Sequence, residues 1–138
     1  MLIKKLTDLS SFVAGDQTLL KEVLNPAEPN ADVRYSLAHA VVKPGNTTLK
    51  HRLKSSEVYY ILKGEGVMTI DHETEKVYPN QLVYIPPMAL QCIENTGHTD
   101  LEFLCICDPA WRKEDEVINP SDITTIETNR RSTSPKRF

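Results

Sequence analysis

Two residues near the middle of the chain, His51 and Glu57, have the side chains of a metal or acid–base site. Imidazole nitrogens and carboxylate oxygens bind transition metals, and both groups transfer protons near neutral pH. Residues two apart in a strand share a face, so the residue expected to join His51 is at position 53. That residue is Leu53, a hydrocarbon side chain that has no donor atom.

The same alternation predicts which neighbours face the interior. Glu57 and Tyr59 follow His51 and Leu53 onto the inner side after a short bend. The opposite face then receives three basic side chains, Lys50, Arg52 and Lys54. Because Lys and Arg usually stay exposed, we expect a solvated outer edge there and no phosphate-binding patch.

Short strands must position these groups. Between residues 33 and 107, β-branched and aromatic runs alternate with turn formers about every 8 to 12 positions, which is typical of a sandwich or barrel. The expected strands are 33–42, 48–53, 57–64, 66–71, 75–79, 81–87, 91–95 and 101–108. No helix of about twelve residues fits between them.

The flanking segments are expected to differ from this barrel. Residues 1–32 are expected to add N-terminal strands at a sheet edge, with 18–24 as a strand and a helical turn as the alternative. Residues 33–110 form the barrel, and residues 111–138 are a charged segment that ends in a tail. The last ~15 residues have too few apolar groups to offset their ordering entropy, so we expect that tail to be mobile.

Composition excludes several classes of protein. The 138 residues match one domain, with 40% hydrophobic residues, 25% charged residues and a net charge of −3. This charge gives no reason to expect nucleic acid or an anionic membrane as partner. No apolar run approaches the ~20 residues of a membrane span, and residues 1–12 lack the apolar core of a signal peptide. We therefore expect a cytoplasmic protein.

The three cysteines are Cys92, Cys105 and Cys107. Their odd number and the absence of CxxC spacing argue against a disulfide framework and against a structural zinc site. Cys105 and Cys107 share one face of the strand 101–108, where thiols act as soft ligands or redox groups if that face is inward. Buried free cysteines usually pack as small hydrophobes, and that is the interpretation adopted.

Two spaced motifs resemble those of the cupin family. The first cupin motif has the form G-x5-H-x-H-x3,4-E-x6-G, and this chain is similar to it at Gly45, His51, Leu53, Glu57 and Gly64, with the second histidine replaced. The second motif, G-x5-P-x-G-x2-H-x3-N, is matched less completely at Asn80, Pro86, Met88, Gln91 and Asn95. Here Asn80 and Met88 stand for the glycines, and Gln91 stands for the ligand histidine.

The resemblance implies an all-β fold, a single-domain cupin double-stranded β-helix (jelly-roll barrel) with extra N-terminal strands. Residues 55–66 and 108–111 also resemble the small cupins described as mannose-6-phosphate isomerase-like. Cupins include dioxygenases, isomerases, epimerases, decarboxylases and sensory domains. Function must therefore be inferred from the site.

Carried over to this chain, the family's metal ligands become His51, Glu57 and Gln91, because Leu53 has no donor atom. One imidazole, one carboxylate and one amide form a reduced set for Mn, Fe, Ni or Zn, with water in the open positions. The alternative is a hydrogen-bonded cluster without metal. His39 would restore a two-histidine, one-carboxylate set suited to iron, but the turn at Pro44-Gly45 prevents a prediction of its facing.

Two functions remain open. The first is a metal-dependent or proton-transferring enzyme of isomerase or epimerase type, with Glu57 and His51 catalytic and a small polar metabolite as substrate. The expected substrate contacts are Tyr59, Tyr84, Gln91, Met88 and His39. The second is a small-molecule-binding or sensory cup without metal or chemistry. In either case we expect a homodimer, since the N-terminal strand offers a sheet edge that needs covering.

Two histidines and one aromatic residue are interpreted as structural. His72 and His98 fall in turns and are expected to be exposed and chemically idle. Trp111 either closes the mouth of the pocket, contributes to a subunit contact or packs on the end of the barrel, the last being the simplest interpretation.

Overall fold

The computed structural model describes residues 1–119 of the chain, and almost all of the ordered elements in that part are strands. Helical structure there is limited to two 3-10 helices of three residues, Leu6–Asp8 and Lys113–Asp115. None of the helices in residues 1–119 is long and apolar enough to cross a membrane. The tail expected to be mobile lies outside the described residues.

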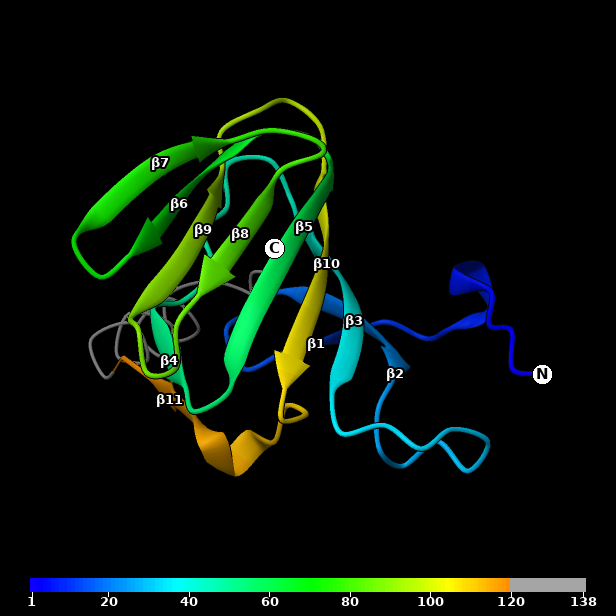
Figure 1. Ribbon diagram of the computed structural model, residues 1–138. Helices are drawn as coiled ribbons and strands as arrows, with labels where there is room; N and C mark the ends of the chain where they lie inside the picture. Colours follow the sequence, from blue (N-terminus) through cyan, green and yellow to red (C-terminus); the bar gives the residue numbers. More distant parts are fainter. Residues whose placement is uncertain (120–138) are drawn as a thin grey trace, which may run out of the picture.

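Two antiparallel sheets form the barrel (Figure 1). The first sheet contains, in spatial order, β1 (Phe12–Val13), β2 (Leu19–Leu24), β3 (Ser36–Val42), β10 (Leu101–Asp108), β5 (Ser56–Lys63) and β8 (Leu82–Ile85). The second contains β11 (Glu116–Ile118), β4 (His51–Leu53), β9 (Gln91–Asn95), β6 (Gly66–Ile70) and β7 (Glu73–Val77). Strands distant in sequence lie side by side, as in a jelly roll, and the predicted all-β fold is confirmed.

The core changes in character along β5. Alternate residues of β5 point inward, and three of them in succession are nearly inaccessible: Glu57 is 5% exposed, Tyr59 4% and Ile61 0%. Ile61 belongs to the apolar core between the sheets, while the ring of Tyr59 packs on Phe103 of β10 with 4.3 Å between centroids. The strand therefore leads from a hydrocarbon core to a buried polar site at Glu57.

Segments that precede and follow the barrel in sequence add strands to its two sheets. The strand predicted at 18–24 is confirmed as β2, which pairs with β3. No strand is expected after residue 108 from the sequence, yet Glu116–Ile118 forms β11 and pairs with β4. Since β4 pairs with β9 only through His51 and Gln91, β11 gives β4 a second partner and fixes its position.

Two turns have the left-handed backbone conformation that glycine adopts most easily, although neither has a glycine at that position. Asn80 and Met88 occupy two of the motif's glycine positions and have φ of 69° and 65°, in the left-handed region. The Met88 turn is bound to β4, because the Met88 amide donates to the Leu53 carbonyl over 2.8 Å. Arg52 also donates to the Met88 carbonyl over 2.9 Å, which places its guanidinium outside the barrel as predicted.

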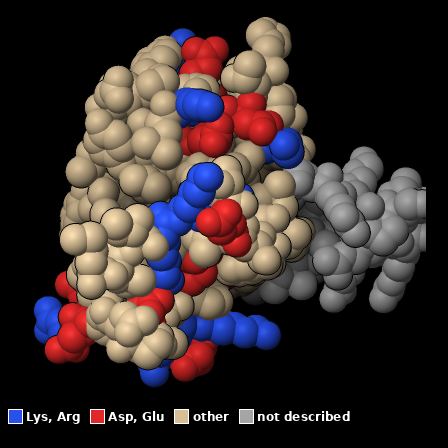
Figure 2. Space-filling view, turned by 90° about the vertical axis from the view of Figure 1, so that its right-hand side faces the viewer, with Lys and Arg blue, Asp and Glu red and all other residues tan. Residues whose placement is uncertain are grey.

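Charged side chains of both signs lie on the surface of the described residues. On the face shown in Figure 2, basic and acidic side chains are mixed and do not gather into a patch of one sign. This distribution agrees with the small net charge of −3. His72 and His98 are both exposed, as expected of residues in turns.

Candidate functional site

A cavity lies at the end of the barrel where β3, β4, β5 and β10 meet the β1–β2 turn and β11. Its volume is about 40 Å³. Its ionisable and sulfur-containing lining residues are Asp16, Glu22, His51, Glu57, Tyr59, Cys105, Cys107 and Glu116.

Glu57 is the most extensively bonded side chain of the site. Gln91 donates from Nε2 to Glu57 Oε1 over 2.7 Å, and Gln91 Oε1 accepts from the Tyr59 hydroxyl over 3.0 Å. On the other oxygen, the Cys105 and Cys107 thiols donate to Oε2 over 2.7 and 3.4 Å. A buried carboxylate needs such donors to offset its lost hydration.

The groups around Glu57 are held in their neutral forms. Burial, followed by the charge of Glu57, raises the pKa of Tyr59 well above its ordinary value. The hydrogen bond with Cys107, burial and Glu57 together raise the pKa of Cys105 well above its ordinary value. The same bond lowers the pKa of Cys107, but burial and Glu57 outweigh it and the net shift is upward. Tyr59, Cys105 and Cys107 therefore keep their protons. The two thiols donate to Glu57, and the Tyr59 hydroxyl donates to Gln91.

His51 has one ring nitrogen committed and one facing acidic groups. Its Nδ1 lies 2.9 Å from the Leu49 carbonyl, which only accepts, so Nδ1 carries a proton. Its Nε2 lies 3.8 Å from Asp16 Oδ2. Burial lowers the pKa of His51, but Asp16, the Leu49 carbonyl, Glu57 and Glu116 outweigh it, and the net pKa is raised. The protonated form of His51 is therefore favoured relative to a free imidazole.

Asp16 reaches the cavity from the β1–β2 turn. Its Oδ1 accepts from both the amide and the hydroxyl of Thr18, over 3.0 and 2.7 Å, and the Leu49 amide donates to its carbonyl over 2.8 Å. This arrangement is an Asx-type turn, which leaves Oδ2 directed at His51. The sequence signal for it was the Asp-x-Thr pattern in a turn, but nothing local indicated that the turn lies against β4.

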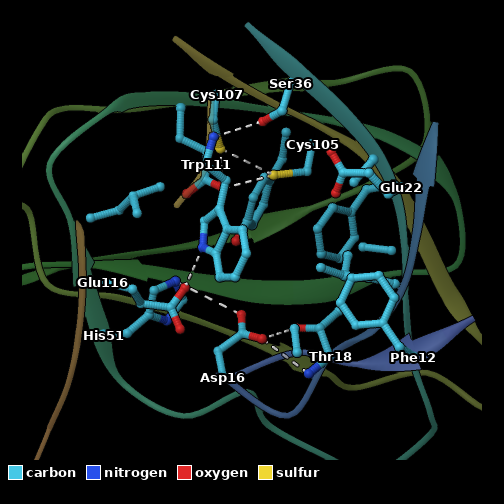
Figure 3. A pocket seen from close by; sticks show the side chains of 18 residues that line it. Phe12, Asp16, Thr18, Glu22, Ser36, His51, Cys105, Cys107, Trp111 and Glu116 are labelled. Carbon is cyan, nitrogen blue, oxygen red and sulfur yellow. Dashed lines mark hydrogen bonds and ion pairs between the residues drawn. The ribbon is translucent and has the colours of Figure 1, made fainter. Parts of the chain in front are cut away.

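Glu116 and Trp111 enter from the C-terminal side. The Trp111 indole donates to Glu116 Oε2 over 2.9 Å, and its backbone amide donates to the Ser36 hydroxyl over 2.9 Å. Burial raises the pKa of Glu116, although the Trp111 bond lowers it in part. In Figure 3 the indole projects into the middle of the lining side chains. Trp111 therefore lines the cavity.

The structure brings together only some of the predicted site residues. His51, Glu57 and Tyr59 line the cavity, and Gln91 is 1% exposed and bonded to two of these three residues. Three predicted substrate contacts lie elsewhere, namely His39, Tyr84 and Met88.

Strand alternation explains the position of each outlying residue. Ala38 and Ala40 take the inward positions of β3, so His39 faces away and its Nε2 pairs with Glu102 Oε1 at 3.1 Å. Tyr84 lies on the outer side of β8 and is 56% exposed. Met88 is 44% exposed in the turn before β9.

The comparisons with known proteins agree with this architecture. Residues 38–107 match the Cupin_2 family, described as a cupin domain. A protein of Methanocaldococcus jannaschii with an uncharacterized function is 38% identical over 111 residues, which cover 80% of this chain and 88% of that protein. The chain belongs to the cupin family.

Two further matches have lower sequence identity. The mannose-1-phosphate guanylyltransferase of Escherichia coli K12 is 28% identical over 94 residues, 67% of this chain and 20% of that enzyme. The chain thus spans about a fifth of the length of that relative. A Thermotoga maritima structure described as a predicted oxalate decarboxylase has a TM-score of 0.69 at 23% identity, covering 78% of this chain and 99% of that one. At this identity the match shows the fold alone.

The ligand set inferred from the family does not fit a metal in this arrangement. Leu53 supplies no donor, and both ends of the Gln91 amide are engaged by Glu57 and Tyr59. Within residues 1–119, the group of three His, Cys, Asp or Glu donor atoms lying within 4.8 Å of one another is Glu57, Cys105 and Cys107. His51 belongs to no such group in that part of the chain.

Proposed function

We propose that the protein binds a small, neutral, hydroxyl-bearing metabolite in the barrel and moves a proton on it, as an isomerase or epimerase does. One observation carries this proposal. Four ionisable side chains from four separate segments, Asp16, His51, Glu57 and Glu116, converge on one cavity. Ionisable groups that gather from separate segments in one cavity favour a functional site, because structure alone gains little from collecting them.

The charge of the lining selects the class of ligand. Four carboxylic acids and one histidine line the cavity, and its lining includes no Lys or Arg. An anionic metabolite would meet repulsion that no guanidinium or ammonium group offsets, whereas sugar hydroxyls donate to carboxylates. The proposal therefore favours unphosphorylated sugars over phosphates and dicarboxylates.

Glu57 and His51 suit the two halves of a proton transfer. The Glu57 carboxylate removes a proton from a carbon next to a carbonyl group, and the electron pair of that C–H bond moves towards the carbonyl oxygen. The His51 imidazolium donates to that oxygen, and an enediol forms. Protonated Glu57 then delivers its proton to the former carbonyl carbon while neutral His51 takes the proton of the neighbouring hydroxyl group, so both side chains return to their starting states. General acid–base catalysis of this kind contributes about 10² to 10⁴ in rate. Gln91 and Tyr59 act through Glu57 as positioning residues.

A second function, binding without chemistry, is favoured by Leu53. A hydrocarbon side chain at a ligand position of the family motif indicates that a metal-dependent reaction of the family is not maintained here. Such a cup would bind the same neutral ligands and would release them unchanged.

Thermal unfolding with a panel of neutral sugars, sugar phosphates and dicarboxylates tests the binding claim. A ligand at about 100 times its Kd stabilises the native state by about 2.7 kcal/mol, and neutral sugars should give the larger shifts. Glu57→Gln should remove the shift, while Glu94→Gln on the outer face of β9 should keep it. Shifts caused by dicarboxylates alone, or equal shifts in both variants, would refute the proposal.

A further inference from the structure

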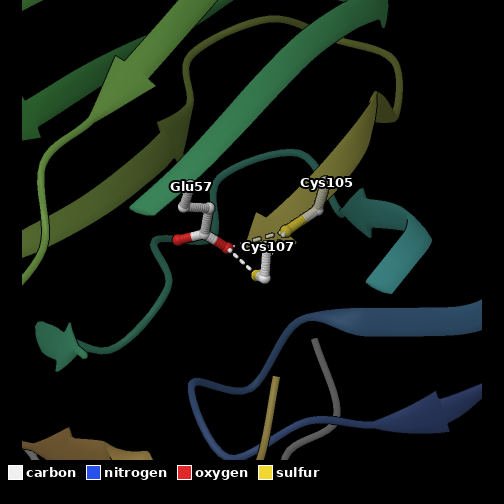
Figure 4. A group of neighbouring side chains, drawn as sticks. All are labelled: Glu57, Cys105 and Cys107. Atoms are coloured by element: carbon white, nitrogen blue, oxygen red, sulfur yellow. Dashed lines mark hydrogen bonds between the residues drawn. The ribbon is translucent and has the colours of Figure 1, made fainter. Parts of the chain in front are cut away.

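Glu57, Cys105 and Cys107 form a compact cluster whose geometry the backbone fixes (Figure 4). The two cysteines are two residues apart on β10 and therefore share its inward face. In the antiparallel register of β5 and β10, Cys107 lies opposite Glu57 and Cys105 lies opposite Tyr59. Both thiols are thus directed at the same carboxylate oxygen, Glu57 Oε2.

The separations match those of a tetrahedral zinc site. The two sulfur atoms are 3.9 Å apart. With Zn–S bonds of about 2.3 Å, a tetrahedron places two sulfur ligands about 3.8 Å apart, and a sulfur and an oxygen ligand about 3.5 Å apart. The Cys107 to Oε2 distance of 3.4 Å already agrees, while the Cys105 distance of 2.7 Å has to lengthen by less than about 1 Å.

A disulfide explains the pair less well. Residues two apart in a strand have Cα atoms about 6.6 Å apart, near the upper limit at which a disulfide closes. Two thiols sharing one carboxylate oxygen instead present the soft sulfur donors that zinc prefers, with one hard oxygen. All three residues line the cavity, so a water molecule can occupy a fourth position.

We propose that Glu57, Cys105 and Cys107 form a binding site for a thiolate-preferring divalent cation, with Zn²⁺ as its representative. On binding, both S–H bonds break and their protons leave to solvent, and each sulfur lone pair forms a Zn–S bond. A Glu57 oxygen and one water complete the tetrahedron, and no atom changes oxidation state. The site uses Glu57 but neither His51 nor Gln91, so it differs from the ligand set implied by the family motifs.

The proposal does not depend on the proposed reaction. It rests on the positions of three side chains, and its tests use no substrate. Since Glu57 serves both, bound zinc and proton transfer by the free carboxylate exclude one another. A failure to bind zinc would leave the reaction untouched, and a failure to find a substrate would leave the zinc site untouched.

The test is a zinc titration of the full chain, which is first reduced and freed of metal with a chelator. A chromophoric chelator competes for the zinc and reports the affinity of the protein. Wild-type protein should bind one Zn²⁺ and should release close to two protons per metal. Replacing an outer-shell partner costs about 10 to 100-fold in affinity, so losing a ligand in Cys105→Ser or Cys107→Ser should cost at least ~100-fold. Co²⁺ in place of zinc should show a thiolate-to-metal charge-transfer band that both variants lose.

Two controls define the site. Cys92→Ser removes a buried cysteine of β9 outside the cluster and should leave zinc affinity unchanged. His51→Ala should also leave it unchanged; loss of zinc in His51→Ala with retention in Cys105→Ser would overturn the proposal. A wild-type protein that takes up no stoichiometric zinc would overturn it as well.

A measurement on wild-type protein avoids any dependence on folded variants. Alkylation rates of the three cysteines are followed by mass spectrometry with and without Zn²⁺. Zinc should slow the alkylation of Cys105 and Cys107 at least ~10-fold and leave Cys92 unchanged, because the thiolates become ligands. Equal rates at Cys105 and Cys107 with and without zinc would contradict the proposal.

Discussion

Gln91 donates to Glu57 over 2.7 Å at the position where the second cupin motif has a ligand histidine. The Tyr59 hydroxyl donates to Gln91 Oε1 over 3.0 Å, which orients the amide so that its NH₂ group faces the carboxylate. A hydrogen-bond donor thus stands where a metal ligand would stand in the motif. The relay from Tyr59 through Gln91 to Glu57 supplies part of what the buried carboxylate needs.

Gln91→Glu should destabilise the fold at neutral pH. It replaces the donor to Glu57 with a second buried carboxylate, at a cost of about 3 kcal/mol or more, and the loss should shrink in acid as one carboxylate takes up a proton. Urea unfolding at several pH values measures the effect. Gln81→Glu, in an exposed turn, is the matched control and should change stability by less than ~0.5 kcal/mol. Equal stability of the two variants at neutral pH would refute the relay.

Tyr59→Phe should cost about 1 to 2 kcal/mol, because it leaves the buried Gln91 oxygen without its donor. The packing of the ring on Phe103 is retained, so a larger loss is not expected. Tyr84→Phe provides the control on the same sheet, since Tyr84 is 56% exposed and should lose less than ~0.5 kcal/mol. Unfolding free energies that do not distinguish the two variants would count against the assignment.

Asp16→Asn should flatten the pH dependence of stability. The pKa of His51 is raised in the folded protein, so its protonation contributes stability fully below its unfolded pKa of about 6.5. That contribution is lost as the pH rises through the folded pKa. Asp16 is the strongest of the groups that raise this pKa, and asparagine keeps the Oδ1 acceptor for Thr18.

The measurement is the free energy of unfolding from pH 5.5 to 8.5. The wild-type advantage over Asp16→Asn should be largest at the acid end of this range and should shrink towards the alkaline end. Asp32→Asn, at an exposed position, should keep the wild-type profile. A constant difference between wild type and Asp16→Asn would show that the two side chains are not coupled.

Met88→Gly should stabilise the protein. Met88 has φ of 65° and is 44% exposed, so glycine relieves a left-handed backbone and gives up little buried surface. That conformation costs a non-glycine residue about 1 to 2 kcal/mol, against ~0.5–1 kcal/mol for the extra freedom of unfolded glycine, so the net gain should be at most about 1.5 kcal/mol. Thermal unfolding measures the gain, and a lower Tm than wild type would contradict this account of the turn.

Gly64→Ala should instead destabilise the protein. Gly64 has φ of 80°, and an added Cβ would lie 2.6 Å from the Asp100 carbonyl oxygen. The substitution should therefore cost at least ~1–2 kcal/mol.

The motif spacing could predict the barrel and the meeting of His51, Glu57 and Gln91, because turn residues and alternation fix the register of neighbouring strands. The spacing could not predict that Asp16 and Glu116 lie at this site. These arrive on segments far away in sequence, and only the pairing of β11 with β4 and the bond from Leu49 to Asp16 place them. Both cysteine thiols were expected to pack as hydrophobes. They face the cavity because the register sets Cys107 opposite Glu57.

The central claim, proton transfer by Glu57, is tested most directly by incubating zinc-free protein with unphosphorylated aldoses and ketoses in D₂O and following deuterium uptake by mass spectrometry. Wild-type protein should introduce deuterium next to the carbonyl carbon of at least one sugar. Glu57→Gln should slow this at least ~100-fold and Glu94→Gln should not. Binding of a neutral sugar without any exchange, or exchange that persists in Glu57→Gln, would contradict the catalytic account; the former result would leave the protein a binding cup.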